Sequence, residues 1–383
     1  MGDMANIDLG AGKEVRITHT AELALIFEPE DLSGLAKWAV ELINSKQDVP
    51  GFKSQCINKI IVEDVEPEYI EVDQSNSSFR YGNYLVKIRK KLDLTNRSIR
   101  VLSALSKSRF ENTPKYFGHV ELEVFGKSVE FITVYEFIEN STDGWTWAPQ
   151  KLVSKDLYWV NQLGQICAEM HRDLKPIAIE ENINYLEVSE NLINDLDNDY
   201  KKPENYDFQG YPDPDEVFEL WQELSNRYFT KLKQRKDRLS FSNKNNQMTH
   251  GDFHVGQILK VKENYLIIDF DGSPVLQAET KNGGAPVESD VAHFLTSIAL
   301  AARVGERVNK LEYGQLNEVV KSAQDAFLMS YQDQARSLGL SPLDLGLVEY
   351  LSLRQYLFEI IYAQKYLPRW IYAPVISLQQ ELG

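Results

Sequence analysis

The segment His250-Gly-Asp-Phe-His-Val-Gly-Gln257, followed by Ile268-Asp-Phe-Asp-Gly272, decides how this sequence is interpreted. Between the two motifs, two mainly apolar stretches are joined by the short polar turn Lys262-Glu263-Asn264, which predicts a β-hairpin. Asp252 lies on the loop before this hairpin, Gln257 lies where the loop enters it, and Asp269 lies at its far end. Because a short turn brings the two ends of a hairpin together, we expect these three side chains to converge.

Two carboxylates and one amide in this arrangement match the requirements of phosphoryl transfer. Asp252 can orient an acceptor hydroxyl and take its proton, while Gln257 and Asp269 can hold the magnesium ion that bridges nucleotide phosphates. Protein kinases have H-R-D-x-x-x-x-N and D-F-G at these places, so Gln257 stands at the position of an Asn ligand. Each residue alone would be typical of a solvated turn, but the three together indicate a catalytic loop.

Two other segments resemble kinase or nucleotide motifs. His171-Arg-Asp-Leu-Lys-Pro176 is similar to a kinase catalytic loop, but it ends an amphipathic helix, and Ala178 stands where a metal ligand is needed. Gly10-Ala-Gly-Lys13 lacks the first glycine and the Ser or Thr of a P-loop, and no strand is predicted before it. We expect neither segment to take part in catalysis.

A kinase also needs a cation and a phosphate-covering turn in its strand-rich part. Lys87 lies in the apolar strand Tyr84-Leu-Val-Lys-Ile88 and is predicted to point inward, toward nucleotide phosphates. Small polar residues before this strand can form a tight turn whose backbone N–H groups face phosphate oxygens. The residues of this turn that are expected at the nucleotide are Ser75, Asn76 and Ser77.

The chain changes character near the segment Glu136–Ser141, where we place the boundary between two lobes. Main-chain groups of Glu136 and Ile138 are expected to bind adenine at this hinge. Strands predominate before it and helices after it, which predicts an α+β, bilobal protein-kinase-like fold. The expected helices cover 21–45, 95–106, 155–174, 217–238 and parts of 286–383, and the expected strands cover 57–73, 79–87, 116–124, 129–137, 257–261 and 265–270.

The composition is that of a globular, acidic protein. The chain has 383 residues with 41 basic and 57 acidic side chains, and its net charge of −16 argues against general binding to nucleic acid or anionic membranes. Two cysteines are too few for a disulfide framework or a cysteine-built metal site. No stretch approaches the roughly 18 apolar residues of a membrane span, and no secretory signal is recognisable. We therefore expect a soluble, cytoplasmic protein with neither nucleic-acid nor membrane partners.

Several segments outside the catalytic hairpin resemble the aminoglycoside-phosphotransferase-like kinases, and within that group the bacterial maltokinases. They are Thr142-Asp-Gly-Trp145, Leu163–His171, Ser289-Asp-Val-Ala292 and Phe358–Trp370. The resemblance implies a bilobal kinase that uses ATP and magnesium. It further implies a cap at 1–70, a nucleotide-binding lobe at 71–138, and a helical lobe with the acceptor site at 139–383.

The resemblance also implies that the acceptor is a small sugar. Maltokinases phosphorylate maltose at the anomeric hydroxyl, so maltose is the expected acceptor, with glucosamine or another amino sugar or disaccharide as the alternative. Carboxylates and aromatic faces bind sugars, and the C-terminal segment supplies both at helical spacing. The residues expected at the sugar are His254, Glu359, Tyr362 and Trp370, although late aromatic residues are also typical of a core.

One departure from the family pattern concerns the partner of Lys87. The helix after this lysine normally carries a Glu that pairs with it, but no acidic residue occurs between Asp93 and Glu111, and Arg100 occupies the expected place. A pseudokinase that binds nucleotide without turnover is therefore a second hypothesis. An aminoglycoside kinase with an acidic acceptor pocket is a third. The intact catalytic loop favours an active enzyme.

The two H-x-D segments can be distinguished by matched substitutions. Asp252→Asn should lower turnover by about 10²–10⁴-fold and leave nucleotide binding nearly unchanged, because a general base acts on the acceptor alone. Asp173→Asn should leave turnover within about twofold. Steady-state kinetics and nucleotide titration of both variants test this assignment, and a collapse of activity in a folded Asp173→Asn protein would show that the wrong loop was chosen.

Overall fold

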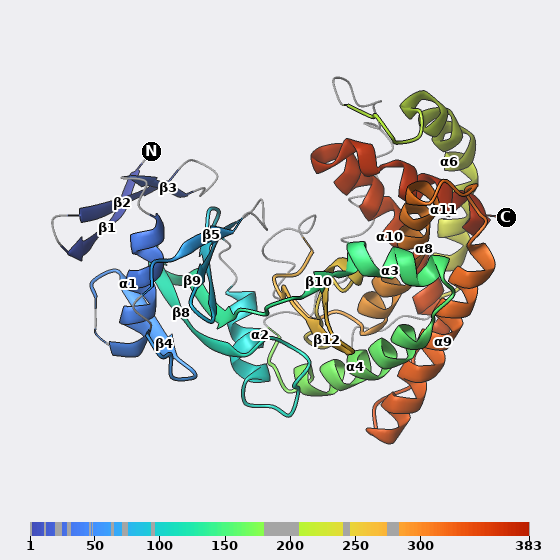
Figure 1. Cartoon of the computed structure of the whole chain (residues 1–383). Coiled ribbons are helices and arrows are strands. Elements are labelled where there is room, and N and C mark those ends of the chain that lie inside the picture. Colours follow the sequence, from blue (N-terminus) through green and yellow to red (C-terminus); the bar gives the residue numbers. More distant parts are fainter. Residues whose placement is uncertain are drawn as a thin grey trace. The chain divides into compact units, whose positions relative to one another are not determined.

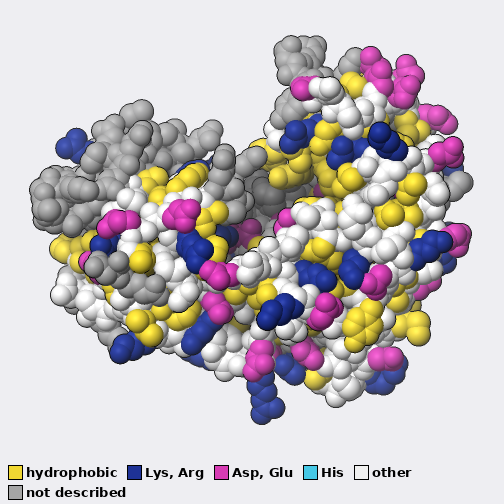
Figure 2. Space-filling model, in the orientation of Figure 1, with side chains coloured by type: hydrophobic (Ala, Val, Ile, Leu, Met, Phe, Trp, Pro, Cys, Tyr) yellow, Lys and Arg dark blue, Asp and Glu magenta, His cyan; other side chains and the backbone are white. Residues whose placement is uncertain are grey.

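A computed structural model describes most of the chain, which divides into two compact units, Met1–Asn140 and Ser141–Gly383 (Figure 1). On the face shown in Figure 2, acidic and basic side chains are interspersed on both units. The residues that the structure describes are 2–10, 13–19, 25–28, 32–45, 47, 49–62, 65–70, 76–92, 96–179, 207–239, 246–273 and 283–382, with the side chains of 2–28 limited to Arg16 and Ile17.

The first unit is built on a six-stranded antiparallel sheet with the strand order β4-β8-β9-β7-β6-β5. A separate three-stranded antiparallel sheet, β1-β2-β3, comes before it in the chain. The strands are β1 (Gly2–Gly10), β2 (Lys13–His19), β3 (Leu25–Glu28), β4 (Phe52–Cys56), β5 (Glu68–Ile70), β6 (Asn76–Tyr81), β7 (Tyr84–Arg89), β8 (Tyr116–Val124) and β9 (Lys127–Glu136).

Helix α1 (Leu32–Ser45) packs on the apolar face of the six-stranded sheet. Its buried residues recur at helical spacing, as Leu35 and Ala39 illustrate, and they share one core with Val86 of β7. Helix α2 (Arg97–Leu105) follows β7 and confirms the helix expected at 95–106. The first unit therefore has an apolar face for its core and leaves the opposite face of the sheet for polar contacts.

Two expected elements are shorter in the structure. The helix predicted over 21–45 begins only at Leu32, because residues 25–28 pair with β2 as strand β3. The strand predicted over 57–73 is wrong for 57–62, and Glu68–Ile70 is the paired part that the structure describes. Apolar β-branched residues favour a strand, but a strand forms only where a partner completes its hydrogen bonds.

The second unit is mainly helical and is organised around helix α8 (Glu288–Val308). Nearly all side chains of α8 are buried, and it contacts α3, α9, α10 and α11, as expected of a helix that is covered on all sides. Every described helix is too short or too polar to cross a membrane. The other helices are α3 (Gly144–Val153), α4 (Tyr158–Leu174), α6 (Pro214–Lys236), α9 (Asn317–Ser337), α10 (Leu345–Tyr366) and α11 (Tyr372–Leu382), with the 3₁₀ turns η2 (Val255–Gln257) and η3 (Pro368–Trp370).

The predicted hairpin is present in the second unit. Strands β11 (Ile258–Val261) and β12 (Asn264–Ile267) pair antiparallel, and β10 (Thr142–Asp143) adds a third strand beside β11. Lys262 in the hairpin turn has a left-handed φ of 54°. The structure thus confirms the α+β fold class, with a strand-rich first unit and a helical second unit.

Candidate active site

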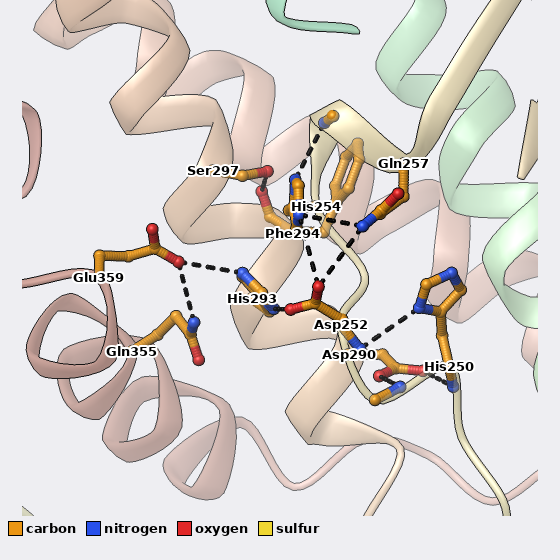
Figure 3. Close-up of polar contacts among 12 residues, drawn as sticks. His250, Asp252, His254, Gln257, Asp290, His293, Phe294, Ser297, Gln355 and Glu359 are labelled. Atoms are coloured by element: carbon orange, nitrogen blue, oxygen red, sulfur yellow. Dashed lines mark hydrogen bonds and ion pairs between the residues drawn. The ribbon is translucent and has the colours of Figure 1, made fainter. Parts of the chain in front are cut away.

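One buried carboxylate holds the loop that carries the catalytic motif. Asp290, in the first turn of α8, accepts hydrogen bonds from the backbone N–H groups of His250 and Gly251 at 2.6 and 2.9 Å (Figure 3). His171 Nε2 lies 3.1 Å from the same carboxylate, and its Nδ1 lies 2.8 Å from the hydroxyl of Tyr331. Asp290 is 1% exposed, so these partners replace the water that a carboxylate would otherwise need.

His171 begins the segment His171–Pro176, which resembles a kinase catalytic loop but supports the true candidate loop in the structure. The histidine is in the last turn of α4, and its carbonyl oxygen accepts a hydrogen bond of 2.8 Å from Gln247 Nε2. Arg172 and Asp173 pair with each other, with Arg172 Nε 2.7 Å from the Asp173 carboxylate. Among the described residues, Asp173 forms no hydrogen bond or ion pair with the His250–Gln257 loop.

Asp252 lies between two histidines. Its Oδ2 atom is 3.4 Å from Gln257 Nε2 and 3.7 Å from His254 Nε2, and its Oδ1 atom is 3.7 Å from His293 Nδ1 (Figure 3). Burial alone would raise the pKa of Asp252, but the hydrogen bond from His254 and the charges of His254, His293 and His250 outweigh it and hold this pKa well below its usual range. Asp252 is therefore ionised throughout the neutral pH range.

The tautomer of His254 follows from its backbone contact. The N–H of Gly256 donates to His254 Nδ1 at 3.0 Å, so the ring proton sits on Nε2 and faces Asp252. Burial lowers the pKa of His254, but the hydrogen bond and charge of Asp252 outweigh it and raise this pKa above its usual value. The Nε2–H group of His254 thus points toward Asp252, and a contact of His254 with the acceptor stays a prediction.

A second carboxylate is linked to Asp252 through His293. Glu359 Oε1 in α10 lies 3.1 Å from His293 Nε2 and accepts a hydrogen bond of 3.0 Å from Gln355 Nε2. Burial raises the pKa of Glu359, but the hydrogen bond from His293 and the neighbouring histidine charges lower it overall. Tyr362 lies one turn later on α10, where its ring contacts Tyr366 at 5.3 Å between centroids.

Asp269 follows the end of the hairpin and has a left-handed φ of 65°. The residue before it, Ile268, donates its N–H to the carbonyl of Gln257 at 3.0 Å, and its own carbonyl lies 2.9 Å from His250 Nε2. The charge of Asp269 also contributes to the raised pKa of His254. The structure thus brings Asp252, Gln257 and Asp269 to one region.

The donor set suits magnesium. Within the described residues no group of three His, Cys, Asp or Glu side chains converges as a metal cage. Magnesium does not need one, because it usually binds one or two protein ligands together with phosphates and water. Gln257 turns its Nε2 toward Asp252, so its amide oxygen faces the other way (Figure 3). That oxygen and the Asp269 carboxylate are the hard oxygen ligands the ion prefers.

An aromatic wall stands beside the loop. Trp145 lies 5.7 Å from the ring of His254 and 4.8 Å, edge to face, from Trp370. Two glycines allow this approach: a Cβ on Gly144 would come within 1.7 Å of the Val255 carbonyl oxygen, and one on Gly256 within 2.3 Å of Trp145 Nε1. Trp370 is thus joined to the loop through Trp145.

The residues expected at the nucleotide lie in the first unit. Lys87 is half-buried on β7, on the sheet face opposite the core, and its strand neighbours are Ser78 and Thr133. The turn predicted before it is wrong for Asn76 and Ser77, because both belong to strand β6 and pair with β7. Ser75 lies outside the described residues. A role of these residues in nucleotide binding stays a prediction.

The predicted hinge follows the last strand of the sheet. Glu136 ends β9, and its N–H donates to the Lys115 carbonyl at 2.8 Å. The N–H of Phe137 donates to the Asn83 carbonyl at 2.8 Å, and Ile138 comes next in the chain. The segment is thus anchored to the sheet up to Phe137, while its contact with adenine remains a prediction.

Comparison with solved structures shows a shared fold. A glucosamine kinase in complex with glucosamine, ADP and inorganic phosphate matches with a TM-score of 0.79 and 23% identity, over 99% of this chain and 94% of that one. This chain has a bilobal kinase fold. A spectinomycin phosphotransferase in complex with ADP and spectinomycin has a TM-score of 0.52 at 15% identity, over 83% of this chain and 94% of the other.

Two of the curated proteins that are similar in sequence are glucosamine kinases. A glucosamine kinase of Mycolicibacterium smegmatis is 41% identical over 130 residues, which are 34% of this chain and 33% of that protein. A glucosamine kinase of Streptacidiphilus jiangxiensis is 25% identical over 330 residues, which are 81% of this chain and 72% of that protein. The aligned part thus spans a third of the length of the first relative. No protein-family model matches the chain.

Two residues of this kinase fold's site were not expected from the sequence. His293 links Asp252 to Glu359, and His171 supports the loop through Asp290. A signal for His293 exists, because it follows Asp290 by three residues in a helix that is otherwise rich in apolar residues. For His171 the signal was misread, since its motif resembles a catalytic loop.

We expect Asp290→Asn to destabilise the protein by about 1–3 kcal/mol at pH 7, because it removes a buried carboxylate that accepts two backbone N–H groups and turns an amide NH₂ toward one of these donors. Since the pKa of Asp290 is lowered in the folded protein, its contribution to stability is present above the unfolded pKa of about 4 and lost as the pH falls. Urea unfolding at pH 7 and below pH 4 measures both effects.

The matched control is Asp333→Asn. Asp333 forms an exposed ion pair with Arg336 at 3.1 Å, and its loss should change stability by less than about 0.5 kcal/mol. Equal effects of the two substitutions would contradict the anchoring role of Asp290.

Proposed function

We propose that this protein is an ATP- and magnesium-dependent kinase that transfers the γ-phosphate to a hydroxyl group of a small amino sugar, glucosamine. The observation that carries the proposal is the linked arrangement of Asp252, His293 and Glu359, in which a second ionised carboxylate lies one histidine away from the proposed base. The kinase fold and the two glucosamine kinase relatives support the same reading.

The amino sugar is favoured over maltose, which was the expected acceptor. Glucosamine carries an amine that is cationic when protonated, and an ionised carboxylate such as Glu359 can bind it with a charge-assisted hydrogen bond. Maltose offers hydroxyls alone and would not use that charge. The named relatives are glucosamine kinases, which supports the alternative acceptor rather than a maltokinase specificity.

Each residue of the loop has a role in this proposal. Asp252 receives the acceptor hydroxyl, with His254 and Gln257 at one of its oxygens and His293 at the other. Its low pKa makes it a weak base, which suffices because a loose phosphoryl-transfer transition state requires little early deprotonation. Gln257 and Asp269 would hold the magnesium ion, and the ion would neutralise charge on the transferring phosphate. Lys87 would contact the nucleotide phosphates, and Trp145 and Trp370 would supply aromatic faces for the sugar.

The acceptor is tested with labelled ATP against glucosamine, glucose, maltose and kanamycin. We expect glucosamine to have a kcat/KM at least about tenfold above that of glucose, because the amine contributes a charge-assisted bond. A preference for maltose or kanamycin would reject the proposed acceptor. Nucleotide binding without turnover on any of the four would instead favour the pseudokinase hypothesis.

Glu359→Gln should raise the KM for glucosamine at least about tenfold while the KM for ATP is unchanged, which is the pattern of lost ground-state binding. Glu349→Gln is the matched control, because Glu349 lies on the same helix and pairs with Arg235 at the exposed surface. Both KM values should stay unchanged in the control. If Glu359→Gln raised both KM values and lowered thermal stability, Glu359 would be a core residue.

Asp269→Asn should weaken binding of ATP in the presence of magnesium and leave magnesium-free nucleotide binding nearly unchanged, since a neutral amide is a poorer magnesium ligand. Calorimetric titration with ATP, with and without magnesium, measures the difference. Unchanged affinity in magnesium would remove Asp269 from the proposed metal site.

A further inference from the structure

Helix α2 is not held to the sheet through Lys87. The helix, Arg97–Leu105, contains no carboxylate, and within the described part of the first unit no carboxylate lies at ion-pairing distance from Lys87 Nζ. Among the described residues, this ammonium group lies over the ring of Tyr135, 5.9 Å from its centroid. Another interaction must therefore set the position of α2 against β7.

An ion pair two residues further along β7 takes that place. Arg89 lies on the same sheet face as Lys87, and its Nη2 and Nε atoms are 2.6 and 3.0 Å from Glu130 Oε1 on β9. The Ser98 hydroxyl of α2 donates to Glu130 Oε2 and accepts a hydrogen bond of 3.3 Å from Arg89 Nη2. Glu130 is 4% exposed, so this carboxylate joins β7, β9 and α2 in a buried environment.

A β-bulge turns Glu130 toward the helix. Between β8 and β9 the register shifts so that Val120 pairs with Ile132 and Glu121 with Glu130, and the extra residue, Phe131, packs in the core. Glu130 thereby points to the face opposite the core. The bulge is secured by the residue before α2, Asn96, which has a left-handed φ of 51°.

Asn96 acts as a strand partner at this bulge. Its Oδ1 accepts the N–H of Glu130 at 2.6 Å, and its Nδ2 donates to the Ser128 carbonyl at 2.5 Å and to Glu121 Oε1 at 2.9 Å. Asn tolerates the left-handed region better than most residues, and its amide presents the donor and acceptor of a peptide group. Asn96 thus attaches the start of α2 to both β8 and β9.

We infer that Glu130 is the positioning residue of the nucleotide-binding lobe, clamping α2 to the sheet through Arg89 and Ser98. It takes the role that a helix glutamate paired with the strand lysine has in related kinases. The inference rests on the proposed function for its nucleotide. Arg89 is paired with Glu130, whereas Lys87 on the same sheet face is left to contact the phosphate oxygens of the nucleotide. Removing Lys87 should therefore not release the helix.

The test compares Glu130→Gln with Lys87→Met in the full chain. Hydrogen exchange of the α2 amides reports whether the helix is clamped, and calorimetry with ATP and magnesium reports nucleotide binding. Glu130→Gln should speed exchange in α2 at least about tenfold and raise the nucleotide Kd at least about tenfold, with the acceptor KM unchanged. Lys87→Met should raise the nucleotide Kd and leave α2 exchange at the wild-type rate.

Two further variants, Glu130→Asp and Ser98→Ala, test the clamp independently of Glu130→Gln. Glu130→Asp should restore part of the protection of α2, and Ser98→Ala should speed exchange in α2 in a folded protein even if Glu130→Gln does not fold. Equal exchange in Lys87→Met and Ser98→Ala would overturn the clamp, and so would wild-type nucleotide affinity in a folded Glu130→Gln protein. If the wild-type protein bound no ATP at all, the proposed function would fail, while the exchange rates would still decide on the clamp.

Discussion

The catalytic half of this protein depends on the carboxylate of Asp290. It accepts two backbone N–H groups of the His250–Gln257 loop and faces His171 from a neighbouring helix. Phe253 and Val255 bury apolar side chains of this loop, and the buried carboxylate with its directed hydrogen bonds fixes the backbone just before them. The geometry at Asp252, its distance to Gln257 and the entry into the hairpin all follow from that anchor.

The site around Asp252 places two carboxylates beside histidines in a partly buried space. Two histidines flank the base, and Glu359 contacts His293 on the side away from Asp252. Burial by itself would favour the neutral carboxylic acids, yet the histidines keep both carboxylates ionised. An acceptor with a cationic amine would enter a site whose negative charge is already present, so little rearrangement of charge is required on binding.

In the first unit, too, a buried carboxylate with directed polar contacts is used, here to position a helix against a sheet. Its sheet has an apolar face covered by α1 and a polar face on which Arg89, Glu130 and Ser98 connect strand and helix. Directed polar contacts fix α2 where apolar packing alone would allow it to slide. Both units therefore place functional side chains on rigid elements by means of buried charges that are fully partnered, Asp290 in one and Glu130 in the other.

The hairpin, the catalytic loop and several helices could be predicted from the sequence, because they depend on local patterns of residues. Mainly apolar stretches on either side of Lys262-Glu263-Asn264 indicated the hairpin, and the spacing of Asp252, Gln257 and Asp269 indicated the loop chemistry. Apolar spacing determined α4 and most of α2. The contacts that support them could not be predicted, because His171 meets Asp290, and His293 meets Glu359, only through the packing of separate helices. The bulge that turns Glu130 toward α2 depends on the register of β8 against β9, which no single strand encodes.

Local chemistry was thus determined by the sequence alone, whereas the partners of each charge were decided by the tertiary structure, since long-range pairing depends on how whole elements pack.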